Sequence, residues 1–170
     1  MTTDDTTVNL TQARERYFDK GLDPDLEAAV ASAIFSPDQV ESGPEVVLFV
    51  GGAILAGEVI PAWQWVVERH RSKFVGARDS EEEQKVEAAL DEIAAHYKKP
   101  LIRRSELEAR EDDPTEDEKQ ELFEPVRFLN LRNARYVSPA GNVPTNGGVY
   151  MRVRATSIDA WAEGTLSSDS

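Results

Sequence analysis

Residues 46–60 decide the fold, and they read VVLFVGGAILAGEVI. The first five side chains are apolar and mostly β-branched or aromatic, which predicts a strand in a run too short for a helix. Gly51 and Gly52 allow the positive φ angles of a two-residue hairpin turn, so residues 53–60 are expected to return as a second strand. Gly57 inside that return strand predicts a bend or a bulge.

A second β-rich block lies far along the chain, in residues 126–166. Residues 149–156 alternate between apolar and polar side chains, as a half-buried strand does. An isolated hairpin is only marginally stable in water, so the two blocks are expected to form one unit. The sequence therefore predicts an α+β domain built on a bent antiparallel sheet or a small β-barrel. In the strand before the turn, one parity holds Leu129, Leu131 and Val137, and the other holds Phe128, Ala134 and Tyr136.

Helix signals surround these strands. A short helix is expected over residues 11–20, and Asp23 followed by Pro24 predicts the start of another, because Asp caps helices and Pro fits the first helical turn. Pro61 predicts the start of a third helix. It carries Trp63 and Trp65, which cannot share a helix face, so one is expected in the core and the other in an exposed contact.

Two capping-box patterns predict further helices, one beginning at Ser80–Glu83 and one at Thr115–Glu118. The first is expected to end where Lys98 and Lys99 precede Pro100. The chain is thus expected to be one domain over residues 11–166, with an acidic helical insertion at 79–125 and disordered tails at 1–10 and 167–170.

Charge is strongly segregated along the chain, whose formal net charge is −13. Residues 79–125 contain 17 Asp or Glu and 7 Lys or Arg, whereas residues 126–158 contain no acidic residue and five arginines. One interpretation is a solvated acidic surface. The other is self-association into a homo-oligomer, in which the acidic segment of one copy meets the arginine face of another. The candidate interaction face comprises Arg132, Arg135, Arg152, Arg154 and Trp161. The negative net charge makes nucleic acid an unexpected partner.

Few residues support catalysis or a cofactor. Cysteine is absent, which removes disulfides and thiolate chemistry. Glu92 and His96 are spaced to face one metal, but two ligands do not make a site. The glycine pairs fit no phosphate-binding frame. We therefore expect a protein that is not an enzyme and that uses no metal or cofactor.

A membrane location is not expected either. Residues 46–67 are mostly apolar but contain Glu58, Pro61 and Gln64, so they do not fit a membrane span. Residues 1–10 lack the basic start and apolar core of a signal peptide. A cytoplasmic protein is expected.

Several of these segments together are similar to one known family. They are residues 47–60 with the aromatic helix that follows, FLNLRNAR at 128–135, GVYMRVR at 148–154 and IDAW at 158–161. In order and spacing the chain resembles the gas vesicle accessory protein U (GvpU) family. It departs from the family where Met151–Arg154 replaces a Trp-Arg-Gly-Arg pattern. The resemblance implies a non-enzymatic cytoplasmic protein at the gas vesicle surface. Its role would be vesicle assembly or clustering, through self-association and contact with the shell or other gas vesicle proteins.

A weaker resemblance is to Sm-like small barrels, in which a helix precedes a glycine-containing hairpin and a later strand completes the fold. Residues 151–158 are similar to that later strand. This resemblance implies the alternative function, an RNA-binding module that uses the arginine face. The negative net charge opposes that alternative.

Overall fold

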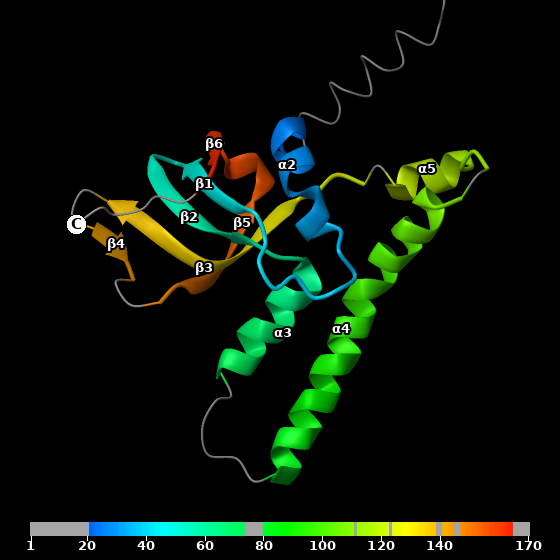
Figure 1. Ribbon diagram of the computed structural model, residues 1–170, viewed down its shortest axis with the longest axis horizontal. Helices are drawn as coiled ribbons and strands as arrows, with labels where there is room; N and C mark the ends of the chain where they lie inside the picture. Colours follow the sequence, from blue (N-terminus) through cyan, green and yellow to red (C-terminus); the bar gives the residue numbers. More distant parts are fainter. Residues whose placement is uncertain are drawn as a thin grey trace, which may run out of the picture.

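The chain folds as one curved sheet between two helical layers (Figure 1). The computed structural model describes residues 21–73, 80–110, 112–122, 124–138, 141–144 and 147–164. The helix expected at 11–20 and the tails expected at 1–10 and 167–170 lie outside the described residues.

The sheet has six antiparallel strands in the order β4-β3-β2-β1-β6, and β5 pairs with the other half of β3. The long strand β3 therefore carries both β4 and β5 on one side and β2 on the other. The strands are β1 (Glu45–Val50), β2 (Ala53–Val59), β3 (Phe128–Ser138), β4 (Gly141–Val143), β5 (Val149–Arg154) and β6 (Ala160–Glu163).

The prediction of an α+β domain with a bent antiparallel sheet is confirmed, but the sheet does not close into a barrel. Within the described residues, β5 pairs only with β3 and β6 pairs only with β1, so the two edges stay open. The chain crosses between these edges through the 3₁₀ turn η1 (Ala155–Ser157). Inside this turn the Ile158 N–H donates to the Ala155 carbonyl, whereas the flanking N–H groups of Ala155 and Asp159 donate to the carbonyls of Arg127, next to β3, and of Phe49 in β1.

The hairpin turn and the bulge occur where the glycines predict them. Gly51 and Gly52 have φ angles of 55° and 81°, so both need the left-handed region that the turn requires. The register between β2 and β3 shifts at Gly57, opposite Asn133, which itself has a φ of 53°. A side chain at position 57 would lie only 3.2 Å from the Ala134 Cα, so this close approach suits glycine.

The bulge corrects the face assignment within β3. Ala134 is fully buried in the same core as Leu129 and Leu131, although the strict alternation had placed it on the opposite face. The extra residue in β3 reverses the parity, as a bulge does. Beyond it, Val137 pairs with Ile54 on the face that carries Arg132 and Glu58.

Helix α2 (Pro24–Ile34) covers the core face of the sheet. Its start is as predicted, since the Asp23 carboxylate accepts from the backbone N–H groups of Asp25 and Leu26 at 3.0 and 3.1 Å. The helix packs Leu26 and Val30 against strand residues that include Val46, Leu48, Val59, Leu129, Leu131 and Val153.

Helix α3 (Ala62–Lys73) lies between the sheet and a long helical arm (Figure 1). Both tryptophans are buried, each with only 7% of its surface exposed, so the prediction that one would be exposed is wrong. Trp63 packs with Val67 of the same helix and with Leu90 of the arm, whereas Trp65 lies beside Arg152 of the sheet. Because α3 has a layer on each side, it needs an apolar contact on both.

The arm is α4 (Ser80–Glu108), a 29-residue helix that continues through Pro100. The predicted end at Pro100 is therefore wrong. Proline removes one backbone hydrogen bond inside a helix. The turns after Pro100 nevertheless stay in contact with the rest of the fold, because Leu107 is only 3% exposed and Arg104 stacks on Phe35 at the end of α2. After α4, the predicted capping box begins α5 (Glu116–Leu122), with Thr115 and Glu118 bonded reciprocally.

The contact between Gly148 and the bulge can be tested by mutation. A Cβ at position 148 would overlap the Asn133 backbone, so Gly148→Ala is expected to lower the free energy of unfolding by about 2–3 kcal/mol. At Gly51 a Cβ would point into open space, so Gly51→Ala should cost only about 1 kcal/mol, from its positive φ. Urea unfolding followed by tryptophan fluorescence compares the two. Equal losses would contradict the close approach.

The capping box of α5 predicts an acid titration. Hydrogen bonds from the Thr115 backbone and side chain and from Arg110 lower the pKa of Glu118 to about 2. Because this pKa is depressed below the ordinary ~4.3, the stabilisation of α5 by Glu118 is complete above that value and is lost as pH falls through about 2. Carboxyl chemical shifts should show this titration. In Thr115→Ala the pKa of Glu118 should return towards its ordinary value, and an unchanged pKa would contradict the cap.

Candidate interaction surface

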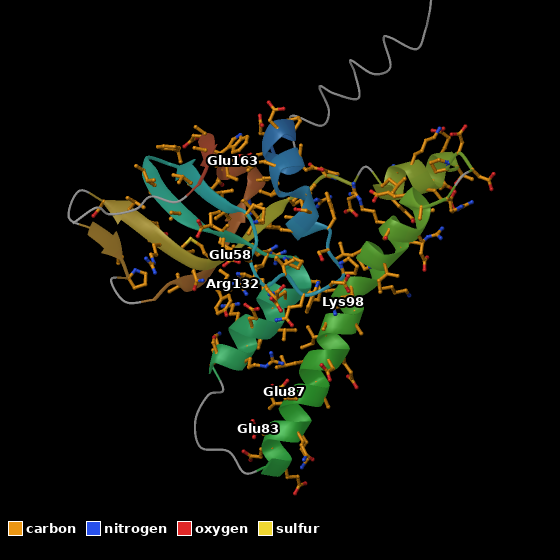
Figure 2. All side chains as sticks on the ribbon, in the orientation of Figure 1. Glu58, Glu83, Glu87, Lys98, Arg132 and Glu163 are labelled. Carbon is orange, nitrogen blue, oxygen red and sulfur yellow. The ribbon has the colours of Figure 1, made fainter. Side chains whose placement is uncertain are left out.

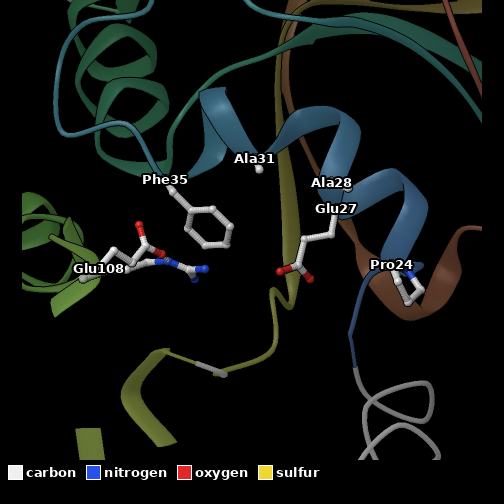
Figure 3. Close-up of a pocket in the computed structure, with 7 residues that line it drawn as sticks. Pro24, Glu27, Ala28, Ala31, Phe35 and Glu108 are labelled. Carbon is white, nitrogen blue, oxygen red and sulfur yellow. Dashed lines mark hydrogen bonds and ion pairs between the residues drawn. The ribbon is translucent and has the colours of Figure 1, made fainter. Parts of the chain in front are cut away.

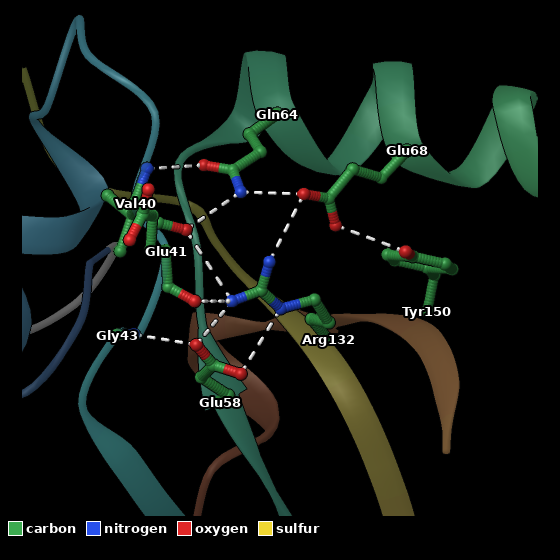
Figure 4. A network of polar contacts seen from close by, with 8 residues as sticks. All are labelled: Val40, Glu41, Gly43, Glu58, Gln64, Glu68, Arg132 and Tyr150. Atoms are coloured by element: carbon green, nitrogen blue, oxygen red, sulfur yellow. Dashed lines mark hydrogen bonds and ion pairs between the residues drawn. The ribbon is translucent and has the colours of Figure 1, made fainter. Parts of the chain in front are cut away.

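The face of the sheet opposite α2 holds a polar network centred on Arg132 (Figure 4). The Arg132 guanidinium binds the Glu58 carboxylate with two hydrogen bonds, of 3.1 Å from Nε and 2.5 Å from the second terminal nitrogen. Its other terminal nitrogen donates to Glu68 of α3 at 3.2 Å. The three side chains are only 13–16% exposed. One cation thus joins strands β2 and β3 to helix α3.

Neutral donors satisfy the rest of this network. The Gly43 backbone N–H donates to Glu58 at 2.6 Å, and the Tyr150 hydroxyl donates to Glu68 at 3.1 Å. Buried Gln64 donates to Glu68 at 2.7 Å and exchanges hydrogen bonds with the backbone of Val40. The network carries two carboxylates and one guanidinium, and these donors compensate the excess negative charge.

These contacts shift the pKa values of two groups in the network. The hydrogen bond to Glu58 raises the pKa of Arg132. Burial, followed by the charge of Glu68, raises the pKa of the Tyr150 hydroxyl. Arg132 was predicted to belong to an exposed contact face, but the fold places its guanidinium in an internal ion-pair network.

The other predicted arginines share this face, because Arg135 pairs with Ala56 and Arg152 with Asn130 across the strands. Arg135 is half-buried, and its Nε has no hydrogen-bond partner among the described residues. Arg152 and Arg154 are exposed at the open edge of the sheet.

Two aromatic rings lie against Arg152 and Arg69. The Arg152 guanidinium carbon lies 4.3 Å from the Phe128 ring centroid and 6.0 Å from that of Trp65. The Arg69 guanidinium carbon of α3 lies 5.0 Å from the same Trp65 ring. Arg154 is the cross-strand partner of Phe128. We call these five residues the arginine–aromatic patch.

The patch has no carboxylate of its own. In the described part of the chain, Arg69, Arg152 and Arg154 take part in none of the ion pairs, which engage Arg71, Lys85, Arg103, Arg104, Arg110, Lys119 and Arg132. A guanidinium that stacks on a ring keeps its N–H edge available for an oxyanion. Sequence reasoning missed Arg69 because α3 lies far from the second β block along the chain.

Trp161, the remaining predicted contact, is not part of the patch. On β6 it pairs with Leu48 of β1, and so it faces the core side of the sheet. It is partly buried and lines an open pocket of about 620 Å³ between β6 and the start of α2.

A second pocket, of about 380 Å³, lies between α2 and α4 (Figure 3). Arg104 stacks over the Phe35 ring at 3.6 Å and pairs with Glu108, while Glu27 lines the other side. Burial raises the pKa of the Glu27 carboxyl, and the charge of Arg104 partly opposes this. These contacts join the arm to α2.

Across the described ranges, no group of three His, Asp or Glu side chains is placed to hold a metal ion. No helix there is long and apolar enough to cross a membrane.

The Arg132 network predicts a specific stability pattern. Arg132→Met should lower the free energy of unfolding by about 2–4 kcal/mol, because it leaves two largely buried carboxylates without their cation. Adding Glu58→Gln and Glu68→Gln should recover part of this loss. Urea unfolding measures it, and Arg127→Met at an exposed position should change stability by less than about 0.5 kcal/mol. If Arg132→Met matched that control, the network would not stabilise the fold.

Comparison with known proteins identifies a family. Neither the curated proteins nor the solved structures include a match to this chain. A family model described as gas vesicle protein GvpU-like matches residues 27–166. This range includes both β blocks, α3, the α4 arm and the arginine–aromatic patch. Since the match covers most of the chain, the protein belongs to the GvpU-like family of gas vesicle proteins.

Proposed function

We propose that this chain is a non-enzymatic accessory protein that acts in the assembly or clustering of gas vesicles. It does so in the cytoplasm, at the vesicle surface, by self-association and by contact with the vesicle shell or other gas vesicle proteins. Family membership supports the connection with gas vesicles. The observation that carries the mechanism is the separation of charge between the arm and the sheet.

The two charged regions lie apart in space. Residues 80–92 of α4 contain six acidic residues and one lysine. Figure 2 shows Glu83 and Glu87 on the part of the arm that projects away from the sheet, far from Glu58 and Arg132. The sheet edge and the adjoining face of α3 instead present the arginines of the patch. Surfaces of opposite charge on one molecule favour association between copies and steer their encounter.

The RNA-binding alternative receives less support. Proteins that bind single-stranded RNA stack bases on accessible aromatic faces. Trp65 is only 7% exposed, and Arg152 covers the Phe128 ring. The patch therefore offers guanidinium edges rather than ring faces, which suits carboxylates of a protein partner.

The proposed function can be tested with purified gas vesicles. The protein is expected to float with the vesicles and to increase their clustering, measured by light scattering, with a smaller effect at high salt because exposed charges are screened. Sedimentation of the protein alone should show self-association at low salt that salt reverses. Absence of vesicle binding would contradict the gas vesicle role. A salt-independent monomer would contradict self-association and favour a solvated acidic surface.

A further inference from the structure

We propose that the arginine–aromatic patch receives the acidic first turn of α4 from a second copy of this chain. This inference rests on the proposed self-association and names the two surfaces that make it. Copies would then join head to tail, with the arm of one against the sheet edge of the next.

The patch has features that favour the binding of carboxylates. The guanidinium groups of Arg69 and Arg152 are restrained by the Trp65 and Phe128 rings, so binding costs less side-chain entropy than it would for free arginines. Arg154 adds a third positive charge on the strand position opposite Phe128. The described residues place no carboxylate within ion-pair distance of them. Glu58 and Glu68, the acidic side chains of the neighbouring network, are already bound to Arg132.

The acidic tip of the arm is the matching surface. Glu81, Glu82 and Glu83 are consecutive and exposed in the first turn of α4. Among the described residues, Glu81 pairs with Lys85 of the same helix, and both side chains are more than 70% exposed. Such an exposed pair is weak and exchanges readily for an arginine partner.

The arm cannot reach the patch of its own copy. Helices α3 and α4 run antiparallel, because Lys98 lies on Trp63 while Glu87 pairs with Arg71. Trp65 is therefore level with the middle of α4, and Glu83 lies 15 residues before Lys98. A rise of about 1.5 Å per residue puts the tip ~20 Å along the helix axis from the level of Trp65. Arg69 lies nearer to the tip along α3, but it stacks on Trp65, whereas Arg71 pairs with α4. The contact must form between copies.

The two surfaces are different, so the contact is heterologous. Each copy would keep one unfilled tip and one unfilled patch until a ring closes, and without closure the assembly would grow as an open chain. Growth of this kind would suit a protein that clusters particles.

Charge exchange in the full chain provides the test. The patch variant is Arg152→Glu/Arg154→Glu, and the tip variant is Glu81→Lys/Glu83→Lys. In each variant alone, tip and patch carry the same sign, so association at low salt should weaken about tenfold or more. An equimolar mixture should restore it, because each variant's tip matches the other's patch. Sedimentation velocity measures all three samples, and circular dichroism checks that each variant is folded.

The control is Lys99→Glu/Arg127→Glu, which changes the net charge as much as the patch variant does. Both positions are exposed and lie outside the patch and the tip, so association should stay near that of the unmodified chain. Undiminished association of the patch variant, or a folded mixture that fails to associate, would overturn the proposal.

Two further results would separate this inference from the proposed function. If the patch variant still self-associates and clusters vesicles, the proposed function stands but the interface lies elsewhere. If single-stranded RNA binds the unmodified chain in a salt-dependent polarisation assay, and the patch variant loses that binding but not self-association, the occupant is nucleic acid and the second-copy proposal is wrong.

Discussion

The arrangement of this protein depends on the bidentate ion pair between Arg132 and Glu58 and its extension to Glu68. Arg132 lies in β3 just before the bulge, Glu58 is near the end of β2, and Glu68 is in the middle of α3. A largely buried guanidinium must be paired, because its desolvation is otherwise uncompensated. This requirement holds the loop around Val40, the sheet and α3 in one geometry.

The position of α3 then determines the direction of the arm. Trp65 faces the sheet and Trp63 faces α4, so the way α3 packs on the sheet sets the orientation of the 29-residue helix α4. The ion pair between Arg71 and Glu87 and the contact between Trp63 and Lys98 define the antiparallel alignment. As a result, the acidic start of α4 projects from the body of the protein rather than folding over it.

Features with a local cause could be predicted from the sequence, whereas those that depend on distant partners could not. Gly51-Gly52, the Asp23 cap and the Thr115–Glu118 box act over a few residues, and each occurs where expected. The face change at Ala134 depends on a bulge shared with Gly57, and the continuation through Pro100 depends on later packing. The partners of Arg132 lie 74 and 64 residues away, so no local pattern marks it as internal. For the same reason Arg69 was missed as a neighbour of Arg152.

Local charge therefore describes the surface better than the net charge of −13 does. Residues 126–158 contain five arginines and no acidic residue, and the two carboxylates of the neighbouring polar network, Glu58 and Glu68, are both bound to Arg132. The acidic tip of the same copy lies ~20 Å along α4 from the level of Trp65, about two screening lengths at ~0.1 M salt, so it neutralises this part of the patch only weakly. An acidic protein can thus keep a positive surface, and a tip from another copy can reach that surface at contact distance.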